Sequence, residues 1–427
     1  MTVQSLPLPR AFAFLQGPPG PLFFQLAEEL RHRGNQVHRI NLSAGDRVDW
    51  PGQATDFRGR FSDWAVYFDI FLRKQRITDL LLFGDCRPYH VTARRIASMR
   101  GIRIHVLEEG YLRPYWMTLE LDGVNAHSRL RRDKEWFYEQ ASLISDEDAA
   151  LPPVTASFRR RVRDAARYYT AVQVGGLLYP FYRNHRRESP LYEAFGWSWK
   201  YLQGSRRERA AGRQIEALAG KRFFLHPLQL SGDFQIRAHS PFPDMQAATS
   251  YLLESFAAHA SSDAHLLIKA HPLDCSFFNW RRFIGRRARK LGVEGRVHFV
   301  DGGDLDLLAA EAEGMVVVNS TSATLALRAD RPVCVLGDAI YKVPGLTFDR
   351  HLDEFWINPP LPEPGLYEAF RQVLVSRCMV RGGLASESAV RTLVEKMAQK
   401  LCGSDAMPML ASQGSTRAKW SSQVGAR

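Results

Sequence analysis

The sequence predicts an α/β protein built from two Rossmann-like domains, with a basic helical segment between them. At 427 residues the chain exceeds the usual size of a single hydrophobic core. Apolar runs of strand length alternate with amphipathic helical patterns over 1–130 and again over 216–380, as in parallel sheets covered by helices. The segment 131–215 lacks this alternation, and a helix over 381–403 follows the second domain.

The same patterns predict the elements in order. The first domain should contain strands at 11–15, 37–41, 79–85 and 102–110, a tight turn at 17–21, and helices at 23–33 and 89–99. The second should contain strands at 221–227, 265–272, 297–301, 315–321 and 332–337, and helices at 244–260, 280–291, 304–312, near 323, at 366–376 and at 386–402. Two such domains with a returning C-terminal helix describe a GT-B-like glycosyltransferase architecture. The polar tail 404–427 is predicted to be disordered.

Composition indicates a cytoplasmic protein. The five cysteines are scattered and odd in number, which indicates reduced thiols rather than a disulfide framework or a zinc site. The chain has no apolar stretch of membrane-spanning length, and its first ten residues lack a signal-peptide pattern.

The net charge of +12 is concentrated in one segment. Residues 159–213 contain 13 Lys/Arg and four Asp/Glu, a net charge of +9, interleaved with aromatic side chains. This composition suits an anionic membrane surface or nucleic acid, and a solvated helix face with inward aromatics is the structural alternative. Because no nucleic-acid-binding signature accompanies the charge, we expect a location at an anionic membrane surface and no nucleic acid partner.

Polar motifs stand where predicted strands end, the edge at which open α/β sheets bind ligands. Glu108 and Glu109 end one strand, and adjacent strand residues point to opposite faces, so one carboxylate should face the crevice. Partial burial would raise the pKa of that carboxylate, as a general acid/base requires. A solvated carboxylate pair is the alternative, and the motif does not choose between the two residues.

Histidines follow two strands of the second domain. His226-Pro227 and His271-Pro272 could donate to a phosphate, and Lys269 adds a positive charge beside His271. A satisfied histidine at a strand end is the alternative for each. Asn319-Ser320-Thr321 precedes a helix, where backbone amides and hydroxyls can bind phosphate, or where the hydroxyls simply cap the helix.

The loop 229–240 carries many side chains that can bind a sugar acid. Asp233 follows a glycine and could act as a nucleophile toward an anomeric carbon, with Gln229 and Arg237 nearby in sequence. An ordinary polar loop in which Asp233 caps a turn is the alternative. Asp304-Leu-Asp306 resembles a metal-binding DxD motif, but its position after two glycines predicts a helix cap, and we expect no metal.

Together these motifs resemble the KpsS/LipB-type capsule polysaccharide biosynthesis and export family of Gram-negative bacteria. The resemblance is carried by FLQGPPGPLFFQLAEEL (14–30), LLFGDCRPYH (81–90), EEGYLRPYWMTLELDGVNAHS (108–128), HPLQLSGDFQIRAHS (226–240), IKAHPLD (268–274), VVNSTSATLAL (317–327), LGDAIYKVPGLT (336–347) and DEFW (353–356). These stretches add Gln16, Gly17, Asp85 and Arg113 to the candidate site residues.

The resemblance implies a retaining β-Kdo transferase. Such an enzyme moves 3-deoxy-D-manno-octulosonic acid (Kdo) from CMP-Kdo to lyso-phosphatidylglycerol at the inner membrane, among the proteins that build and export capsule. By similarity, Asp233 would be the nucleophile and Glu108 or Glu109 the acid/base. His271, Ser320 and Thr321 would hold the CMP phosphate, and no cofactor is implied. The alternative is a non-catalytic component of the capsule export assembly.

Overall fold

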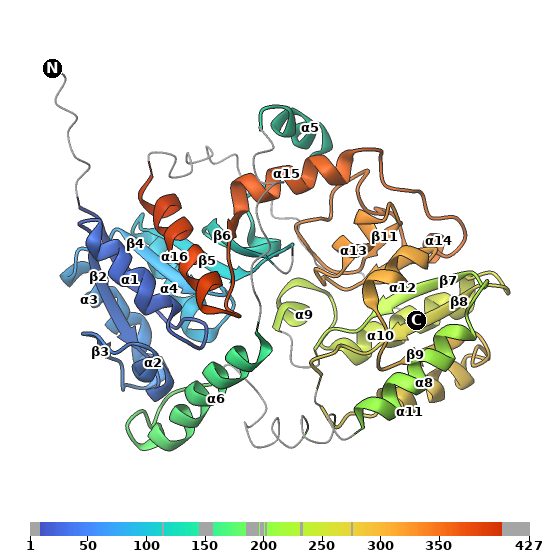
Figure 1. Cartoon of the computed structure of the whole chain (residues 1–427), viewed down its shortest axis with the longest axis horizontal. Helices are drawn as coiled ribbons and strands as arrows, with labels where there is room; N and C mark the ends of the chain where they lie inside the picture. The colour runs from blue at the N-terminus through green and yellow to red at the C-terminus, as the bar shows by residue number, and fades with distance from the viewer. Residues whose placement is uncertain are drawn as a thin grey trace.

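The computed structural model describes residues 9–112, 115–144, 157–184, 196, 200, 203–230, 234–274 and 276–403. Two α/β domains lie side by side, each with a sheet between layers of helices (Figure 1). This confirms the fold class predicted from the sequence.

The N-terminal domain contains a seven-stranded sheet of order β12-β6-β5-β4-β1-β2-β3. Its strands are β1 (Ala11–Phe14), β2 (Gln36–Asn41), β3 (Thr55–Asp56), β4 (Asp79–Phe83), β5 (Arg103–Glu109), β6 (Trp116–Leu121) and β12 (Met379–Arg381). β1 to β5 pair in parallel, whereas β6 runs antiparallel to β5 and β12 antiparallel to β6. The helices of this domain are α1 (Leu22–His32), α2 (Ala44–Asp49), η1 (Phe61–Asp63), α3 (Trp64–Lys74), α4 (Pro88–Met99), η2 (Asn125–His127) and α16 (Glu387–Cys402).

The C-terminal domain contains a five-stranded parallel sheet of order β11-β10-β7-β8-β9. Its strands are β7 (Phe223–Pro227), β8 (His265–Lys269), β9 (Val297–Val300), β10 (Gly314–Val317) and β11 (Val333–Val335). Its helices are α9 (Phe234–His239), α10 (Met245–His259), α11 (Trp280–Lys290), α12 (Leu305–Glu311), α13 (Ala323–Arg328), α14 (Leu352–Phe355) and α15 (Leu366–Cys378). The central strands are buried on both faces, which explains their continuous apolar sequences.

The basic segment contributes helices that pack on different parts of the molecule. α5 (Lys134–Ser142) packs on α15, and α6 (Phe158–Val174), followed by η4 (Gly175–Leu177), packs on α2 of the N-terminal domain. α8 (Gly204–Glu216) packs on β9 of the C-terminal domain. None of the helices within the described ranges combines the length and apolarity needed to cross a bilayer.

The chain returns to the first domain at its C-terminal end. β12 adds a strand to the N-terminal sheet, and α16 packs on α1 (Figure 1). Leu393, Met397 and Leu401 of α16 are buried in one apolar cluster with Phe14 and Leu26. The helix over 386–402 was predicted, but the short strand before it was not.

Candidate functional site

The carboxyl ends of β1, β4 and β5 lie next to one another in the N-terminal sheet. Asp85, just beyond β4, is fully buried and accepts a hydrogen bond from His127 Nδ1 at 2.8 Å. Arg94 Nη1 lies 3.4 Å from the same carboxylate. Burial opposes ionisation, but the His127 hydrogen bond and the Arg94 charge together lower the pKa of Asp85 to about 2. Asp85 is therefore a permanent anion at neutral pH.

A histidine of the other domain contacts this carboxylate's neighbours. His239, the last residue of α9, lies with Nε2 3.5 Å from Cys86 Sγ, and its ring meets the His127 ring edge to face at 4.6 Å. Burial, with the nearby His127, lowers the pKa of His239 to about 4, so its ring is neutral at pH 7. The Cys86 thiol donates to Asp85 Oδ1 at 3.1 Å, and burial and the Asp85 charge raise its pKa. Sequence reasoning missed this contact between the domains.

The structure separates Glu108 from Glu109. The Glu109 carboxylate forms an ion pair with Arg161 of α6. The Glu108 carboxylate lies close enough to Cys86 to raise the pKa of that thiol. Adjacent strand residues point to opposite faces, so Glu108 lies on the Cys86 side of β5 and Glu109 on the Arg161 side.

Gln16 and Gly17, beyond β1, have structural partners. Gln16 is buried, and its amide donates to the hydroxyls of Tyr168 at 2.7 Å and Tyr182 at 2.9 Å. The Gly17 carbonyl accepts from Arg87 Nη1 at 3.3 Å, and a Cβ at Gly17 would come within 2.8 Å of the Phe23 ring. Both residues help to fix the α6 segment and the first loop beside Asp85.

In the C-terminal domain, neutral groups lie at the carboxyl ends of the sheet strands β7 and β10. His226, fully buried on β7, lies with Nδ1 2.7 Å from the Val316 carbonyl, and burial lowers its pKa to about 4. Its Nε2 has no hydrogen-bond partner among the described residues. Gln229 and Asn319 are buried together: Gln229 Nε2 donates to Asn319 Oδ1 at 2.8 Å, and Asn319 N donates to Gln229 Oε1 at 3.1 Å. This amide pair joins the loops after β7 and β10.

Lys269 ends the neighbouring strand β8, and His271 follows two residues later. Lys269 is buried, which lowers the pKa of its ammonium group, and the Asp301 charge is the largest effect that opposes this shift. His271 Nδ1 accepts from the Leu273 amide at 3.1 Å, so the ring is fixed over the loop that the exposed Pro272 begins. The His271 carbonyl accepts from Lys200 at 3.3 Å.

Ser320 and Thr321 lie between β10 and α13. Ser320 Oγ accepts from the Ser322 amide at 3.2 Å, and the Ser320 carbonyl accepts from the Tyr341 hydroxyl at 2.5 Å. The Thr321 carbonyl accepts from Thr324, and Ser322 does not cap α13 with its side chain. A hydroxyl of this motif, that of Ser320, thus accepts a backbone amide where α13 begins, although the N-cap residue Ser322 makes no side-chain cap. The capping prediction for Asp304 is confirmed, because its side chain accepts from Asp306 N at the start of α12.

Two predicted site residues, Asp233 and Arg113, lie outside the described residues. α9 begins at the residue after Asp233, and Figure 1 shows α9 between the two domains. Arg237 is exposed on α9. The segment 229–239 is thus anchored at both ends, to Asn319 of the C-terminal sheet edge and to Cys86 of the N-terminal one.

Further contacts join the domains near η2. Asn125 Oδ1 accepts from the Ile340 amide at 3.2 Å, and Arg132 forms an ion pair with Asp338. Asp338 N in turn donates to the His239 carbonyl at 2.7 Å. These contacts hold the end of α9 against Asp85 and its neighbours.

One group of side chains has the composition of a metal site. The candidate ligand atoms of Cys86, His127 and His239 lie within 4.8 Å of one another, and such a set suits zinc or a similar transition metal. In the structure both Cys86 and His127 instead donate hydrogen bonds to Asp85.

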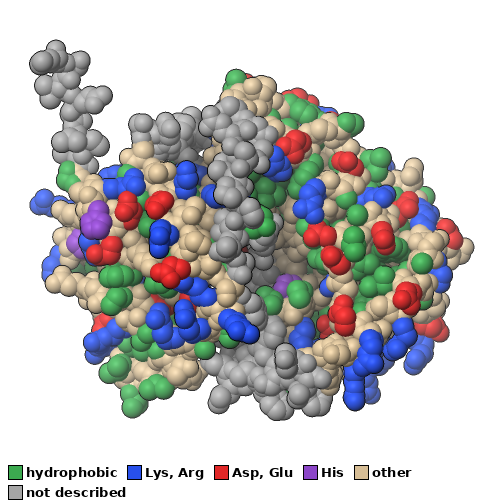
Figure 2. Space-filling model, viewed as in Figure 1, with side chains coloured by type: hydrophobic (Ala, Val, Ile, Leu, Met, Phe, Trp, Pro, Cys, Tyr) green, Lys and Arg blue, Asp and Glu red, His purple; other side chains and the backbone are tan. Residues whose placement is uncertain are grey.

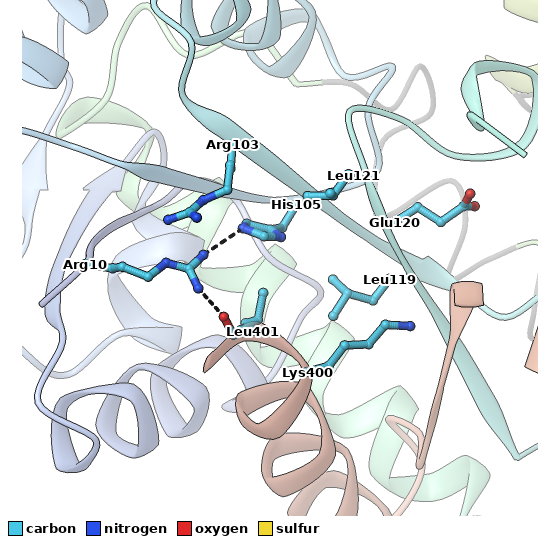
Figure 3. Close-up of a pocket in the computed structure, with 8 residues that line it drawn as sticks. All are labelled: Arg10, Arg103, His105, Leu119, Glu120, Leu121, Lys400 and Leu401. Carbon is cyan, nitrogen blue, oxygen red and sulfur yellow. Dashed lines mark hydrogen bonds between the residues drawn. The ribbon is translucent and has the colours of Figure 1, made fainter. Parts of the chain in front are cut away.

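A separate pocket lies at the opposite edge of the N-terminal sheet (Figure 3). Arg10, Arg103 and His105 line it and all contact the buried Asp79. Lys400 also lines it and donates to the carbonyls of Arg377 and Met379. These contacts connect β1, β4 and β5 to α16, so we assign the pocket to structure.

The family model and the curated relatives identify one family. Residues 78–384 match the family described as capsule polysaccharide biosynthesis protein. The chain is 34% identical over 381 residues to the capsule polysaccharide modification protein LipB of Neisseria meningitidis serogroup B, a match that covers 87% of this chain and 91% of that protein. It is 32% identical over 385 residues to the capsule polysaccharide export protein KpsS of Escherichia coli, covering 87% and 96%. Among solved structures, Thermosulfurimonas dismutans KpsC, a beta Kdo 2,7 transferase, matches with a TM-score of 0.42 and 16% identity over 90% of this chain and 99% of that one.

Proposed function

The chain belongs to the capsule polysaccharide biosynthesis family, and on this premise we propose that it transfers Kdo from CMP-Kdo to a lyso-phosphatidylglycerol acceptor with retention of configuration. The observation that supports this most directly is the anchoring of 229–239 at both sheet edges. Asp233 is four residues from Gln229 and six from His239, so the candidate nucleophile belongs to the segment that connects the two edges.

Retention requires two inversions at the anomeric carbon. In the first, an Asp233 oxygen bonds to that carbon as its bond to the CMP phosphate oxygen breaks. CMP leaves as an anion, for which His271 and the Ser320 and Thr321 hydroxyls are the proposed donors. In the second, an acceptor hydroxyl loses its proton to a base and displaces Asp233.

Glu108 is the proposed base for the second step. Glu109 is engaged by Arg161, whereas Glu108 faces the Asp85–Cys86 side of the crevice. We propose that no metal takes part, because CMP is already a good leaving group.

The second candidate function is a non-catalytic role in capsule export. It is favoured by the name of the Escherichia coli relative, a capsule polysaccharide export protein. This role predicts that the purified protein releases no CMP when donor and acceptor are both present.

The decisive experiment incubates the protein with CMP-Kdo and a fluorescent lyso-phosphatidylglycerol and measures both CMP release and the acceptor mass. We expect a mass increase of one Kdo, and loss of this product in Asp233→Asn, which keeps the side-chain shape but removes the nucleophilic charge. Asp244→Asn is the matched control, since Asp244 caps α10 and asparagine is an equally good cap. Full activity of Asp233→Asn would overturn the double displacement.

A further inference from the structure

The end of α6 and the turn after it expose an unusual group of apolar side chains. Leu177 is 95% exposed, Val174 80%, Leu178 49% and Phe181 45%. These four residues, here called the α6 tip, project from the bottom of the N-terminal domain. Figure 2 shows hydrophobic side chains there, at the lower left, with Lys and Arg side chains just above. Such a concentration of exposed apolar side chains indicates an interaction surface.

The tip is held in a defined position. Gly175 packs so closely on Ala44 of α2 that a Cβ at Gly175 would come within 2.2 Å of the Ala44 Cβ. Tyr179 is buried, and its hydroxyl donates to Asp56 at 2.7 Å. Tyr182 stacks on Tyr89 with ring centroids 6.1 Å apart. The apolar side chains are therefore presented outward by a packed base.

Arginines surround this base. The Arg60 guanidinium lies 5.1 Å from the Phe181 ring centroid, and Arg58 lies 5.6 Å from that of Tyr179. Arg183 covers the ring of Phe61, and Arg47 lies 3.6 Å from Asp56. An apolar tip bordered by cations and aromatics is complementary to an anionic lipid bilayer, whose acyl region takes the tip and whose headgroups take the arginines.

The two ends of α6 face different parts of the molecule. At its beginning, Arg161 pairs with Glu109 at the end of β5, the strand that also carries Glu108, and Arg160 lies 3.6 Å from Asp164. At its other end is the apolar tip. The 17 residues of α6 span about 25 Å at 1.5 Å per residue, so one rigid element connects the tip to the edge of the site.

We propose that the α6 tip inserts into an anionic bilayer surface and sets the position of the crevice relative to it. The docking proposal extends the proposed function. It rests on that function only because it takes the acceptor to be a lipid. Val174, Leu177 and Leu178 enter the acyl boundary, and the arginines at 47, 58, 60 and 183 contact the headgroups.

The test measures co-sedimentation of the full chain with vesicles of 30% phosphatidylglycerol in phosphatidylcholine, and with pure phosphatidylcholine vesicles, without CMP-Kdo. We expect binding to the anionic vesicles, and a decrease of at least tenfold in the partition coefficient for the double variant Val174→Ser/Leu177→Ser. Leu307→Ser/Leu361→Ser is the matched control, because these side chains are 63% and 67% exposed elsewhere. Arg60→Gln/Arg183→Gln should reduce the preference for anionic vesicles.

Unchanged partitioning of the tip variant, or equal loss in the control, would overturn the proposal. So would failure of the wild type to bind either kind of vesicle, which would assign the tip to a protein partner.

A transfer assay separates failure of this proposal from failure of the proposed function. The tip variant should retain activity on a short-chain acceptor dissolved as monomers and lose it on acceptor embedded in vesicles. If the protein bound vesicles normally but transferred Kdo to neither acceptor, the proposed reaction would be rejected and the proposed membrane-docking surface would stand.

Discussion

The two edges of the crevice differ in how their polar groups are satisfied. On the N-terminal side, the buried Asp85 carboxylate is held as an anion by His127 and Arg94. On the C-terminal side, His226 and the Gln229–Asn319 amide pair are buried and neutral, and Lys269 is buried at the end of β8. Among the described residues at these two edges, a buried carboxylate (Asp85) thus lies on the N-terminal side and a buried amine (Lys269) on the C-terminal side. A nucleotide sugar with an anionic phosphate would be disfavoured at the first edge and tolerated at the second, which separates acid/base chemistry from anion binding in space.

The largest effect that tests this comparison is expected within the glutamate pair. Glu108→Gln should lower kcat about 10²- to 10⁴-fold, because it removes the proposed base. Glu109→Gln should lower kcat by less than about tenfold, since it removes only an ion pair with α6 that is partly open to solvent. Steady-state kinetics with CMP-Kdo and lyso-phosphatidylglycerol would measure both.

Arg161→Gln serves as the control for this pair. It breaks the same ion pair from the other side, so it should reproduce the small effect of Glu109→Gln. If Glu109→Gln were the more damaging of the two glutamate variants, the base would have to be reassigned and the role of α6 with it.

A smaller effect concerns stability and pH. His226 is neutral in the folded protein because its pKa is lowered to about 4, against 6.5 when unfolded. Its contribution to stability is therefore complete above about pH 6.5 and declines as the pH falls toward 4, by up to about 3 kcal/mol. Asp85 also has a lowered pKa, but its window runs from about pH 4 down to about 2.

Urea unfolding of the wild type and His226→Asn between pH 7 and 4 would separate these windows. Asparagine does not titrate, so the loss of unfolding free energy over this range should be smaller in the variant, even if the variant is less stable at pH 7. Asp85→Asn should leave the slope between pH 6.5 and 4.5 unchanged. Equal slopes for the wild type and His226→Asn would show that His226 is not held neutral.

Much of the scaffold of both edges could be predicted from the sequence. The runs that form β1, β4, β5 and β8 are continuous and apolar because these strands are buried on both faces. Strand β12 was missed because its three residues are too few to show an alternating hydrophobic pattern. Its pairing with β6 also joins segments that are far apart in the chain.

The contacts between the edges could not be predicted. Cys86 and His239 are separated by 153 positions, and Glu109 and Arg161 by 52, so each contact depends on how helices and domains dock. Strand alternation showed that only one glutamate could face the crevice. Identifying it required the position of Arg161.

The smallest expected effect concerns the place where the two edges meet. Cys86 and His127 both donate to Asp85, so their protons are already used, and a metal bound to Cys86, His127 and His239 would have to displace them. We expect that treatment with EDTA leaves the transfer rate unchanged and that the purified protein contains no stoichiometric metal by elemental analysis. Cys86→Ser should behave like Cys402→Ser, a substitution of a distant thiol on α16. If EDTA abolished activity and Zn²⁺ restored it in the wild type but not in Cys86→Ser, a cation would instead bridge the two edges. Only a cation between them would make ligands from both domains necessary for one chemical step.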